Sequence, residues 1–299
     1  MAVNYEVVTM SELFYPGHSS CAGCPAAIAI RAILNAAGKN TVISNATSCS
    51  EIISTPYPMS SWGVPYIHVL FETAASVASG IEAALKKLGK EANVIALAGD
   101  GGTYDIGLQA LSGMVDRGHD VLYICYDNEC YANTGIQRSS ATPYAAWTTT
   151  SPSGRVSIGN ETFKKPIAEM MAVQGAPYVA TSSVGYPEDI EAKVKKALSI
   201  KGPKFIVIHA PCPLAWRFEA PNTVNVAKLA VETGMWVLYE IENGRLKITK
   251  EPSGKKVDEY IKAQGRFKHV TEKETKKMQK RVDEDWKKYK ELQNTGVRI

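Results

Sequence analysis

The sequence of 299 residues lacks the features that would place it in a membrane, outside the cell or among disordered proteins. Its best apolar run, 24–30, ends at Arg31, far short of the roughly 18 residues that a membrane-spanning helix needs. Residues 1–14 have neither the basic start nor the apolar block of a signal peptide. Hydrophobic residues make up 45% and charged residues 21%, which is a globular composition. We therefore expect a soluble, cytoplasmic protein with no membrane partner.

The net charge of +4 is unevenly distributed along the chain. Residues 245–299 hold 17 Lys and Arg against 9 Asp and Glu, whereas the preceding residues carry an acidic excess. Charges of both signs alternate through residues 271–293, a pattern that is typical of a solvated helix rather than of a nucleic-acid-binding tail. We expect no nucleic-acid partner, and we expect this helix to dock on a partner subunit.

The core of the chain follows the pattern of an α/β fold. Strands that are apolar on both faces are predicted at 93–98, 120–126 and 204–210, with another at 41–45. Residues 105–117 place their apolar side chains on one helical stripe, so the first two strands and this helix predict a parallel βαβ unit. Further helices are predicted at 24–37, 72–88 and 187–199. The fold class is a mostly parallel sheet with helices on both faces.

A change of pattern near residue 235 divides the chain. Alternating stretches within 235–250 flank Asn243-Gly244, the pair that favours a type I′ hairpin turn. We predict an α/β domain over 1–234 and a C-terminal extension over 235–299, made of this hairpin and a basic, charged helix. The long polar segment 139–165 is predicted to be an ordered functional loop.

Two loops carry oxygen ligands at the ends of neighbouring predicted strands. Asp100 stands among the glycines of Gly99-Asp-Gly101-Gly102, where a strand ends and a helix begins, and Asn128 follows the next strand. Glycines at such a turn let backbone N–H groups approach a phosphate, and a carboxylate there suits a hard cation. The nucleotide patterns G-x-G-x-x-G and GxxxxGK[ST] are absent. Because open α/β sheets bind ligands at this edge, a Mg²⁺–diphosphate site is predicted; a simple strand–helix turn is the alternative.

Four of the six cysteines are placed like metal ligands. Cys21 and Cys24 form a CxxC pair, Cys49 lies in a polar loop, and Cys212 stands between prolines after a predicted strand. Cys125, by contrast, lies inside a strand and is typical of a small core residue. Four thiolates bind either zinc or a [4Fe–4S] cluster, and the spacing alone also allows no metal at all.

These motifs together resemble one enzyme family. A Gly-Asp-Gly followed by Asn is similar to the thiamine diphosphate signature of thiamine enzymes, in the half that binds the pyrophosphate. The fuller pattern resembles the β subunit of the pyruvate:ferredoxin oxidoreductases (pyruvate synthases), members of the 2-oxoacid:ferredoxin oxidoreductases. It spans residues 10–220 and includes the segments 17–24, 45–49, 55–58, 99–113, 126–139, 141–144 and 210–213.

The resemblance implies specific ligands. The side chains of Asp100 and Asn128 and the backbone carbonyl of Cys130 would bind Mg²⁺, and the backbone at Gly99, Gly101 and Gly102 would contact the diphosphate of thiamine diphosphate. Asn133 matches a residue beside the thiazolium and the substrate, and is the predicted catalytic residue; a turn-capping Asn is the alternative. The set of [4Fe–4S] ligands that it implies is Cys21, Cys24, Cys49 and Cys212.

Other residues near these motifs have open roles. Thr134 and Gln137 are further candidates for cofactor binding in the Asn133 loop. His18 borders the CxxC pair and is either a neighbour of the cluster or a structural histidine. His68 and Glu72 either shape the cofactor cleft or pack, and Arg138 either binds an anion or forms a surface salt bridge.

The resemblance also implies the reaction and its partners. Pyruvate would be oxidatively decarboxylated with coenzyme A to acetyl-CoA and CO₂, reversibly. The cluster would remove electrons one at a time and ferredoxin would receive them. The glutamate that activates thiamine lies on another subunit in this family, so an obligate hetero-oligomer is predicted, with pyrimidine-binding α, γ and ferredoxin-like δ subunits. The chain has no CxxCxxC run, which places the distal electron carriers on a partner.

The substrate prediction rests on the loop Asn133-Thr134-Gly135, which the pyruvate-type subunits share. Pro25 and Ala215 stand where the family usually has glycine, which indicates altered cluster surroundings or a relative that acts on oxalate. Another small 2-oxo acid is a further alternative. Two other classes stay open: a thiamine enzyme without redox chemistry that has a structural metal site, and a zinc-stabilised, non-catalytic binding subunit.

Overall fold

A computed structural model describes residues 12–298, and the strands in this part of the chain form a single eight-stranded sheet. The strand order is β2-β1-β3-β4-β6-β5-β7-β8, in which the first six strands are parallel and the last two antiparallel. The strands are β1 (Thr41–Ala46), β2 (Tyr66–Val69), β3 (Asn93–Gly99), β4 (Leu122–Asp127), β5 (Tyr178–Ser183), β6 (Lys204–His209), β7 (Leu238–Glu242) and β8 (Arg245–Lys250).

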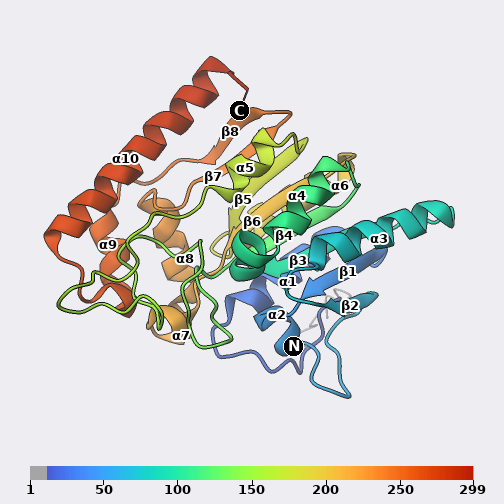
Figure 1. The fold of residues 1–299 in the computed structure, drawn as a ribbon, viewed down its shortest axis with the longest axis horizontal. Helices are drawn as coiled ribbons and strands as arrows, with labels where there is room; N and C mark the ends of the chain where they lie inside the picture. Colours follow the sequence, from blue (N-terminus) through green and yellow to red (C-terminus); the bar gives the residue numbers. More distant parts are fainter. Residues whose placement is uncertain (1–11, 299) are drawn as a thin grey trace, which may run out of the picture.

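Helices cover both faces of this sheet, as the sequence predicted (Figure 1). The α-helices are α1 (Pro25–Ala37), α2 (Cys49–Ile52), α3 (Ala74–Lys87), α4 (Leu108–Asp116), α5 (Ile167–Val173), α6 (Pro187–Ser199), α7 (Pro213–Trp216), α8 (Thr223–Glu232), α9 (Val257–Lys262) and α10 (Glu272–Thr295). A π-helix, η1 (Gly101–Ile106), precedes α4, and two 3₁₀ turns are η2 (Ala220–Asn222) and η3 (Gly265–Phe267). The predicted helix at 105–117 therefore starts earlier, as a π-helix.

The central strands are apolar on both faces because each face packs on a different layer of helices. On β3, β4 and β6 one set of alternate residues joins the core under α1 and α6, and the other set joins the core under α3, α4 and α5. The first set is Ile95, Leu97, Leu122, Ile124, Ile206 and Ile208; the second is Ala96, Ala98, Tyr123, Cys125, Phe205 and Val207. Each buried Ile or Leu contributes about 1.5–3 kcal/mol. This double burial fixes the strand ends on which the site depends.

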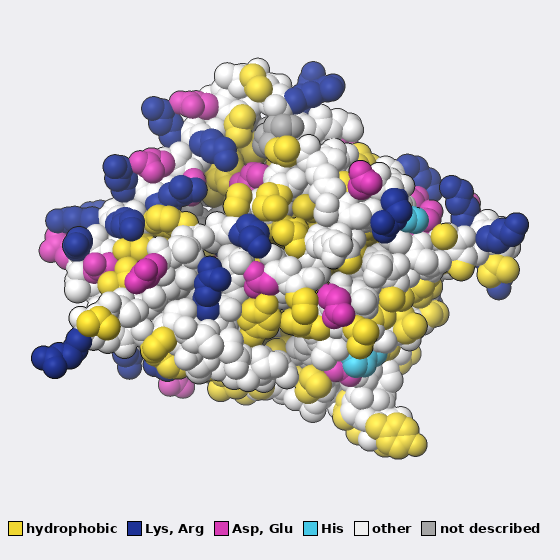
Figure 2. Space-filling view, in the orientation of Figure 1, with side chains coloured by type: hydrophobic (Ala, Val, Ile, Leu, Met, Phe, Trp, Pro, Cys, Tyr) yellow, Lys and Arg dark blue, Asp and Glu magenta, His cyan; other side chains and the backbone are white. Residues whose placement is uncertain are grey.

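The C-terminal hairpin extends the same sheet. β7 pairs with β5, and the turn to β8 has positive φ at both Asn243 (49°) and Gly244 (79°), as the predicted type I′ turn requires. Helix α10 lies at this end of the sheet, opposite β2 (Figure 1), and buries Met278, Val282 and Trp286. Its outer face carries the charges seen over this region in Figure 2, including pairs such as Lys276–Glu272 at 2.7 Å. The prediction of a solvated, charged helix is confirmed.

Across residues 12–298, none of the helices combines the length and the apolar character that crossing a membrane demands. The prediction that the chain has no signal peptide rests mostly on residues 1–11, which lie outside the described residues.

Candidate functional site

Four neighbouring parallel strands end at one edge of the sheet, and each is followed by a predicted ligand. Strands β1, β3, β4 and β6 are consecutive in the sheet, so their carboxyl ends lie side by side. Cys49 follows β1, Asp100 follows β3, Asn128 follows β4 and Cys212 follows β6. The topology thus brings together residues that are up to 163 positions apart in the sequence. The expected ligand-binding edge of an α/β sheet is where the chemistry of this chain gathers.

The glycine turn after β3 is closely packed against the loop after β4. A Cβ atom on Gly101 would lie 2.4 Å from a ring carbon of Tyr131, so a larger residue cannot stand there without displacing the ring. The Tyr131 hydroxyl donates to Asp105 Oδ2 at 3.0 Å and ties the same loop to η1. Glycine at position 101 is therefore required by the close approach of these two loops.

The side-chain amide of Asn128 lies between two oxygen atoms of these loops. In the orientation that satisfies its hydrogen bonds, its nitrogen donates to the Cys130 carbonyl at 2.7 Å and to Asp100 Oδ1 at 3.1 Å. Turning the amide over would direct its oxygen, together with these two, towards a bound cation. A carboxylate, an amide oxygen and a backbone carbonyl are donors that Mg²⁺ accepts. The residues predicted to bind Mg²⁺ are together, and their donor set fits that ion.

The electrostatics at Asp100 also suit a cation. The side chain is 1% exposed, and burial, followed by the nearby Asp127, raises the pKa of Asp100 well above its usual range. The Ser139 hydroxyl donates to Asp100 Oδ2 at 2.5 Å and offsets part of this effect. Because a buried carboxylate is costly without a compensating charge, a divalent cation at this position would stabilise its ionised form.

Three of the four predicted cluster cysteines lie at helix N-termini. Cys24 is the N-cap residue of α1, Cys212 is the N-cap residue of α7, and Cys49 is the first residue of α2. Cys21 is exposed and precedes a turn in which the Cys24 N–H donates to its carbonyl at 3.0 Å. Pro25, which departs from the family pattern, is the first residue of α1, where a proline lacks no hydrogen bond.

These thiols interact electrostatically. Burial, followed by Cys212 and Cys24, raises the pKa of Cys49 to about 12, and a hydrogen bond from the Asn133 side chain offsets part of the rise. Burial also raises the pKa of Cys212, to which Cys24 and Cys21 add. Within residues 12–298, no three His, Cys, Asp or Glu side chains are grouped so that they could hold one metal ion. The charges of Cys24 and Cys212 thus act on Cys49, and those of Cys21 and Cys24 act on Cys212.

The Asn133 loop projects from the site towards solvent. Asn133 and Thr134 are exposed, and the Thr134 hydroxyl donates to Gln137 Oε1 at 2.6 Å while Gln137 Nε2 donates to the Thr134 carbonyl at 2.9 Å. Thr134 and Gln137 therefore hold the shape of the loop. Asn133 is the member of the loop whose side chain offsets part of the rise in the pKa of Cys49, a predicted cluster ligand.

The residues with open roles now have definite surroundings. His18 Nδ1 lies 2.7 Å from the Ser20 hydroxyl and its ring stacks on Phe14, which are structural contacts. Half-exposed His68 pairs with Thr47, with 2.6 Å between Nε2 and the hydroxyl. Glu72 is half-buried in the turn before α3. Arg138 donates to Asn160 Oδ1 at 3.2 Å and to the Thr162 hydroxyl at 2.9 Å, so it braces the 139–165 loop.

A buried ionic network beneath the metal-binding residues was missed by the sequence analysis. Lys164 Nζ lies 2.7 Å from Asp127 Oδ2 and 3.0 Å from Glu129 Oε1, while Arg266 pairs with Glu129 Oε2 at 2.6 Å. Burial alone would raise the pKa of Glu129, but Lys164 and Arg266 outweigh it and hold that pKa at about 2. The two acidic residues at the end of a buried strand, Asp127 and Glu129, could have indicated this network. Their basic partners, Lys164 and Arg266, are distant in the sequence and gave no such indication.

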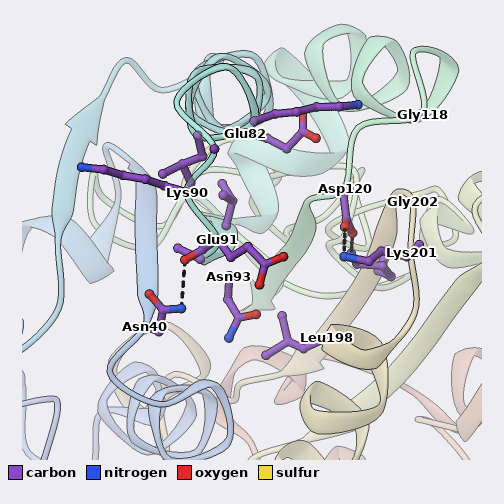
Figure 3. A pocket seen from close by; sticks show the side chains of 16 residues that line it. Asn40, Glu82, Lys90, Glu91, Asn93, Gly118, Asp120, Leu198, Lys201 and Gly202 are labelled. Carbon is purple, nitrogen blue, oxygen red and sulfur yellow. Dashed lines mark hydrogen bonds and ion pairs between the residues drawn. The ribbon is translucent and has the colours of Figure 1, made fainter.

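A pocket lies at the opposite edge of the sheet. It has a volume of about 740 Å³ and is lined by residues at the amino ends of β3, β4 and β6 (Figure 3). Asp120 in it pairs with Lys201 at 3.2 Å, and the Asn40 amide donates to the Glu91 carbonyl at 3.0 Å. None of the predicted site residues lines this pocket.

Comparison with known proteins shows which family the chain resembles. Residues 44–208 match the family described as "Thiamine pyrophosphate enzyme, C-terminal TPP binding domain". The chain is 54% identical to pyruvate synthase subunit PorB of Methanothermobacter marburgensis, over 91% of this chain and 95% of that protein. It is 55% identical to PorB of Methanocaldococcus jannaschii (92% and 96%) and 47% identical to ketoisovalerate oxidoreductase subunit VorB of Pyrococcus furiosus (95% and 94%).

A solved structure shares the fold. It is a 2-oxoglutarate:ferredoxin oxidoreductase from Magnetococcus marinus, with 2-oxoglutarate, coenzyme A and succinyl-CoA bound. The superposition has a TM-score of 0.57 at 23% identity, and covers 66% of this chain and 65% of that one.

Proposed function

The chain belongs to the pyruvate synthase β-subunit family, as a subunit of a thiamine diphosphate-dependent 2-oxoacid:ferredoxin oxidoreductase, and on that premise we propose its cofactors, substrate and partners. It would carry thiamine diphosphate, Mg²⁺ and a [4Fe–4S] cluster. The complex would oxidatively decarboxylate pyruvate with coenzyme A to acetyl-CoA and CO₂, reversibly, and pass the electrons to ferredoxin. We also propose the cytoplasm as its location, because the six cysteines are all free thiols.

The observation that carries this proposal is the meeting of the Asp100 carboxylate, the Asn128 amide and the Cys130 carbonyl beside a glycine turn. These three groups would hold Mg²⁺, and the ion would supply positive charge for the diphosphate. The backbone at Gly99, Gly101 and Gly102 would contact the diphosphate oxygens, because glycines there leave the N–H groups accessible. Burial of Asp100 excludes water from this contact.

Thiamine diphosphate, when bound, supplies the carbon nucleophile and the electron sink that decarboxylation of a 2-oxo acid requires. The role of this chain is to orient that chemistry. Asn133, which is exposed and whose side chain lowers the pKa of Cys49, would present an amide to the substrate near a proposed cluster ligand. This position supports it as the catalytic residue that touches the reacting atoms, with Thr134 beside it.

The cluster assignment is supported by where the thiols lie. Burial raises the pKa values of Cys24 and Cys212, and the main chain at the start of α1 and of α7 offsets part of this rise. Metal ligation would stabilise the thiolate forms that burial disfavours.

Metal analysis tests the cluster directly. Complex prepared without oxygen should contain about four irons and four sulfides per chain, with a visible spectrum that bleaches on reduction. The variant C49S should lose this iron, whereas C125S, which changes a cysteine buried in β4, should keep it. Zinc in place of iron, or equal iron loss in both variants, would refute the assignment and favour a structural metal site.

Pyruvate is the proposed substrate because the PorB subunits of Methanothermobacter, Methanocaldococcus and Methanosarcina are 53–55% identical to this chain, although the Pyrococcus PorB subunits are 48% identical. The VorB relatives at 47–48% identity support a second candidate, a branched 2-oxo acid such as 2-ketoisovalerate. Oxalate is a third, smaller candidate. Turnover of pyruvate, 2-ketoisovalerate, oxalate and 2-oxoglutarate by the assembled complex should favour pyruvate; a preference for any other acid would replace it.

The proposed partners are a pyrimidine-binding α subunit, a γ subunit and a ferredoxin-like δ subunit, with coenzyme A and ferredoxin as reactants. An apolar projection supports an additional protein surface here: residues 55–60 stand out from the fold with Tyr57 98% and Met59 62% exposed (Figure 2). Ile52, Ile67 and Leu70 extend this apolar patch at the β2 edge. The isolated chain should not decarboxylate pyruvate; normal turnover by the chain alone would contradict the hetero-oligomer.

A further inference from the structure

The turn that would hold Mg²⁺ is supported by residues from outside the segment that thiamine enzymes share. The family match ends at residue 208, yet Trp216 and Arg266 both contact the turn at residues 127–130. Neither residue belongs to the glycine turn or to the cysteine set. Both are almost fully buried, at 1% and 2% exposure, which is unusual for an arginine.

Arg266 is held in a single position by three kinds of contact. Its guanidinium pairs with Glu129 Oε2 at 2.6 Å, donates from Nε to Gln264 Oε1 at 2.8 Å, and lies 3.6 Å from the centre of the Trp216 ring. An arginine that is both hydrogen-bonded and stacked has little freedom to move. It therefore acts as a fixed charge beneath Glu129.

Glu129 is the residue between two of the proposed metal ligands. Its backbone has a φ of 64°, a left-handed conformation that a residue with a side chain adopts only when its surroundings impose it. Its N–H donates to Asp127 Oδ1 at 3.0 Å, and its carbonyl accepts from the Thr142 hydroxyl at 2.7 Å. This conformation turns the Asn128 side chain and the Cys130 carbonyl towards Asp100.

Trp216 fixes the preceding residue from the other side. Its indole N–H donates to the Asn128 carbonyl at 2.8 Å, and the Arg266 guanidinium covers its ring. Trp216 ends α7, the helix that Cys212 begins, so the same support reaches a predicted cluster ligand. Arg266 thus lies behind both the metal-binding turn and the last cysteine motif.

We propose that Arg266 is a positioning residue for the metal site: by pairing with Glu129 and stacking on Trp216, it holds the strained turn in the shape that binds Mg²⁺. The inference rests on the proposed function for the identity of the ion. The structural part of it, that Arg266 keeps residues 128–130 in place, does not depend on any cofactor.

The experiment uses the assembled complex, stripped of thiamine diphosphate and Mg²⁺. R266M keeps the length of the side chain but loses the charge and the donors, and R266K restores the charge alone. R217M is the matched control, because Arg217 also stacks on a tryptophan at 3.6 Å, on Trp147, but is exposed. Amide hydrogen exchange of residues 128–133 reports on the turn, and calorimetric titration with Mg²⁺ at saturating thiamine diphosphate reports on the ion.

In R266M we expect exchange at residues 128–133 to rise at least tenfold and Mg²⁺ binding to weaken about 10–100-fold, as for other supports of metal ligands. Turnover at saturating Mg²⁺ should stay within about threefold of wild type, because the ligands themselves remain. R266K should recover part of the affinity and R217M should match wild type.

Two results would overturn the inference: wild-type exchange in the turn of R266M, or an equal effect of R217M. Should R266M fail to assemble, E129Q, which removes the paired charge from the other side, must weaken Mg²⁺ binding in the same direction. A wild-type complex that binds no Mg²⁺ with thiamine diphosphate would instead sink the proposed function, while the exchange data would still decide the role of Arg266.

Discussion

The amino and carboxyl edges of the sheet differ in how far their charged side chains are exposed to solvent. At the amino edge, the ionic side chains around a pocket of about 740 Å³ are mostly exposed or half-buried, as Lys201 is with a 94% exposed side chain, and the one buried cation, Lys204, pairs with Asp120. At the carboxyl edge, Asp100, Asp127 and Glu129 are each at most 5% exposed. The edge with this pocket therefore has the less demanding chemistry.

The difference shows why pocket size is a poor guide to function in this protein. A charge at the surface costs little to keep, whereas a buried carboxylate is stable only where a partner or a ligand compensates it. The carboxyl edge keeps three such groups, two of them on the turn after β4, and one of these two, Glu129, has a left-handed backbone. That concentration of unfavourable groups, rather than volume, marks the site.

The largest difference between the two edges is expected when the same substitution, Asp to Asn, is made at each. D100N should lower turnover more than about 100-fold and abolish Mg²⁺-dependent binding of thiamine diphosphate, because it removes a direct ligand rather than a supporting residue. D120N in the amino-edge pocket should leave turnover within about twofold of wild type. Steady-state assays of the two complexes measure both, and an equal loss in D120N would make the amino edge functional.

The next largest effect is a loss of stability in acid, caused by a histidine at the carboxyl edge. His209 is buried at the end of β6 between Trp216 and Trp236, with Nδ1 unpaired among the described residues, and burial lowers the pKa of His209 to about 3. Since the folded pKa is below the unfolded value near 6.5, this histidine costs no stability above pH 6.5, and stability falls as the pH drops towards 3.

By pH 5 the loss should be about 2 kcal/mol. Urea unfolding of the wild-type chain at pH 7 and pH 5 measures it, and H209F, which keeps the ring between the tryptophans, should be less sensitive over that range. Identical pH slopes for the two proteins would show that His209 is not the acid-sensitive group.

The smallest effect is expected at the amino edge. K201M removes an exposed partner of Asp120, and because Lys204 also pairs with Asp120, the free energy of unfolding should change by less than about 0.5 kcal/mol. Thermal unfolding and turnover should both match wild type. A loss of several degrees in Tm would mean that surface pairing matters more here than its exposure indicates.

Hydropathy predicted the buried elements that consist mainly of apolar residues. Strands β3, β4 and β6 and the connecting helix were recognised because every residue faces a hydrophobic layer. Strand β5 was missed, since Thr181, Ser182 and Ser183 read as polar although all are buried. Their hydroxyls are satisfied locally, as when Thr181 donates to the Val237 carbonyl at 2.6 Å and Ser182 to Asp189 at 2.6 Å. β2 was missed because four residues at an edge carry too little pattern.

The site was predictable where ligands follow strands, and not where they depend on tertiary contacts. Asp100 and Asn128 could be placed together from the strand ends alone. Lys164, in a polar loop, and Arg266, in a basic tail, look like solvated charges in the sequence. Only the folded chain shows that both are turned inward to Glu129. Ion pairs between residues that are far apart in the chain produce no periodic pattern in the sequence, so they could not be predicted from it.

The pairing of Arg266 with Glu129 also bears on how the protein is made. Synthesis runs from the N-terminus, and the elements of the sheet up to β6 emerge well before residue 266 does. The turn at residues 127–130 consequently leaves the ribosome before Arg266 is made, and it gains this contact only as translation finishes. If this turn binds the proposed ion, binding would have to wait for the C-terminal residues, and a prematurely terminated product would keep the proposed ligands without the residue that positions them.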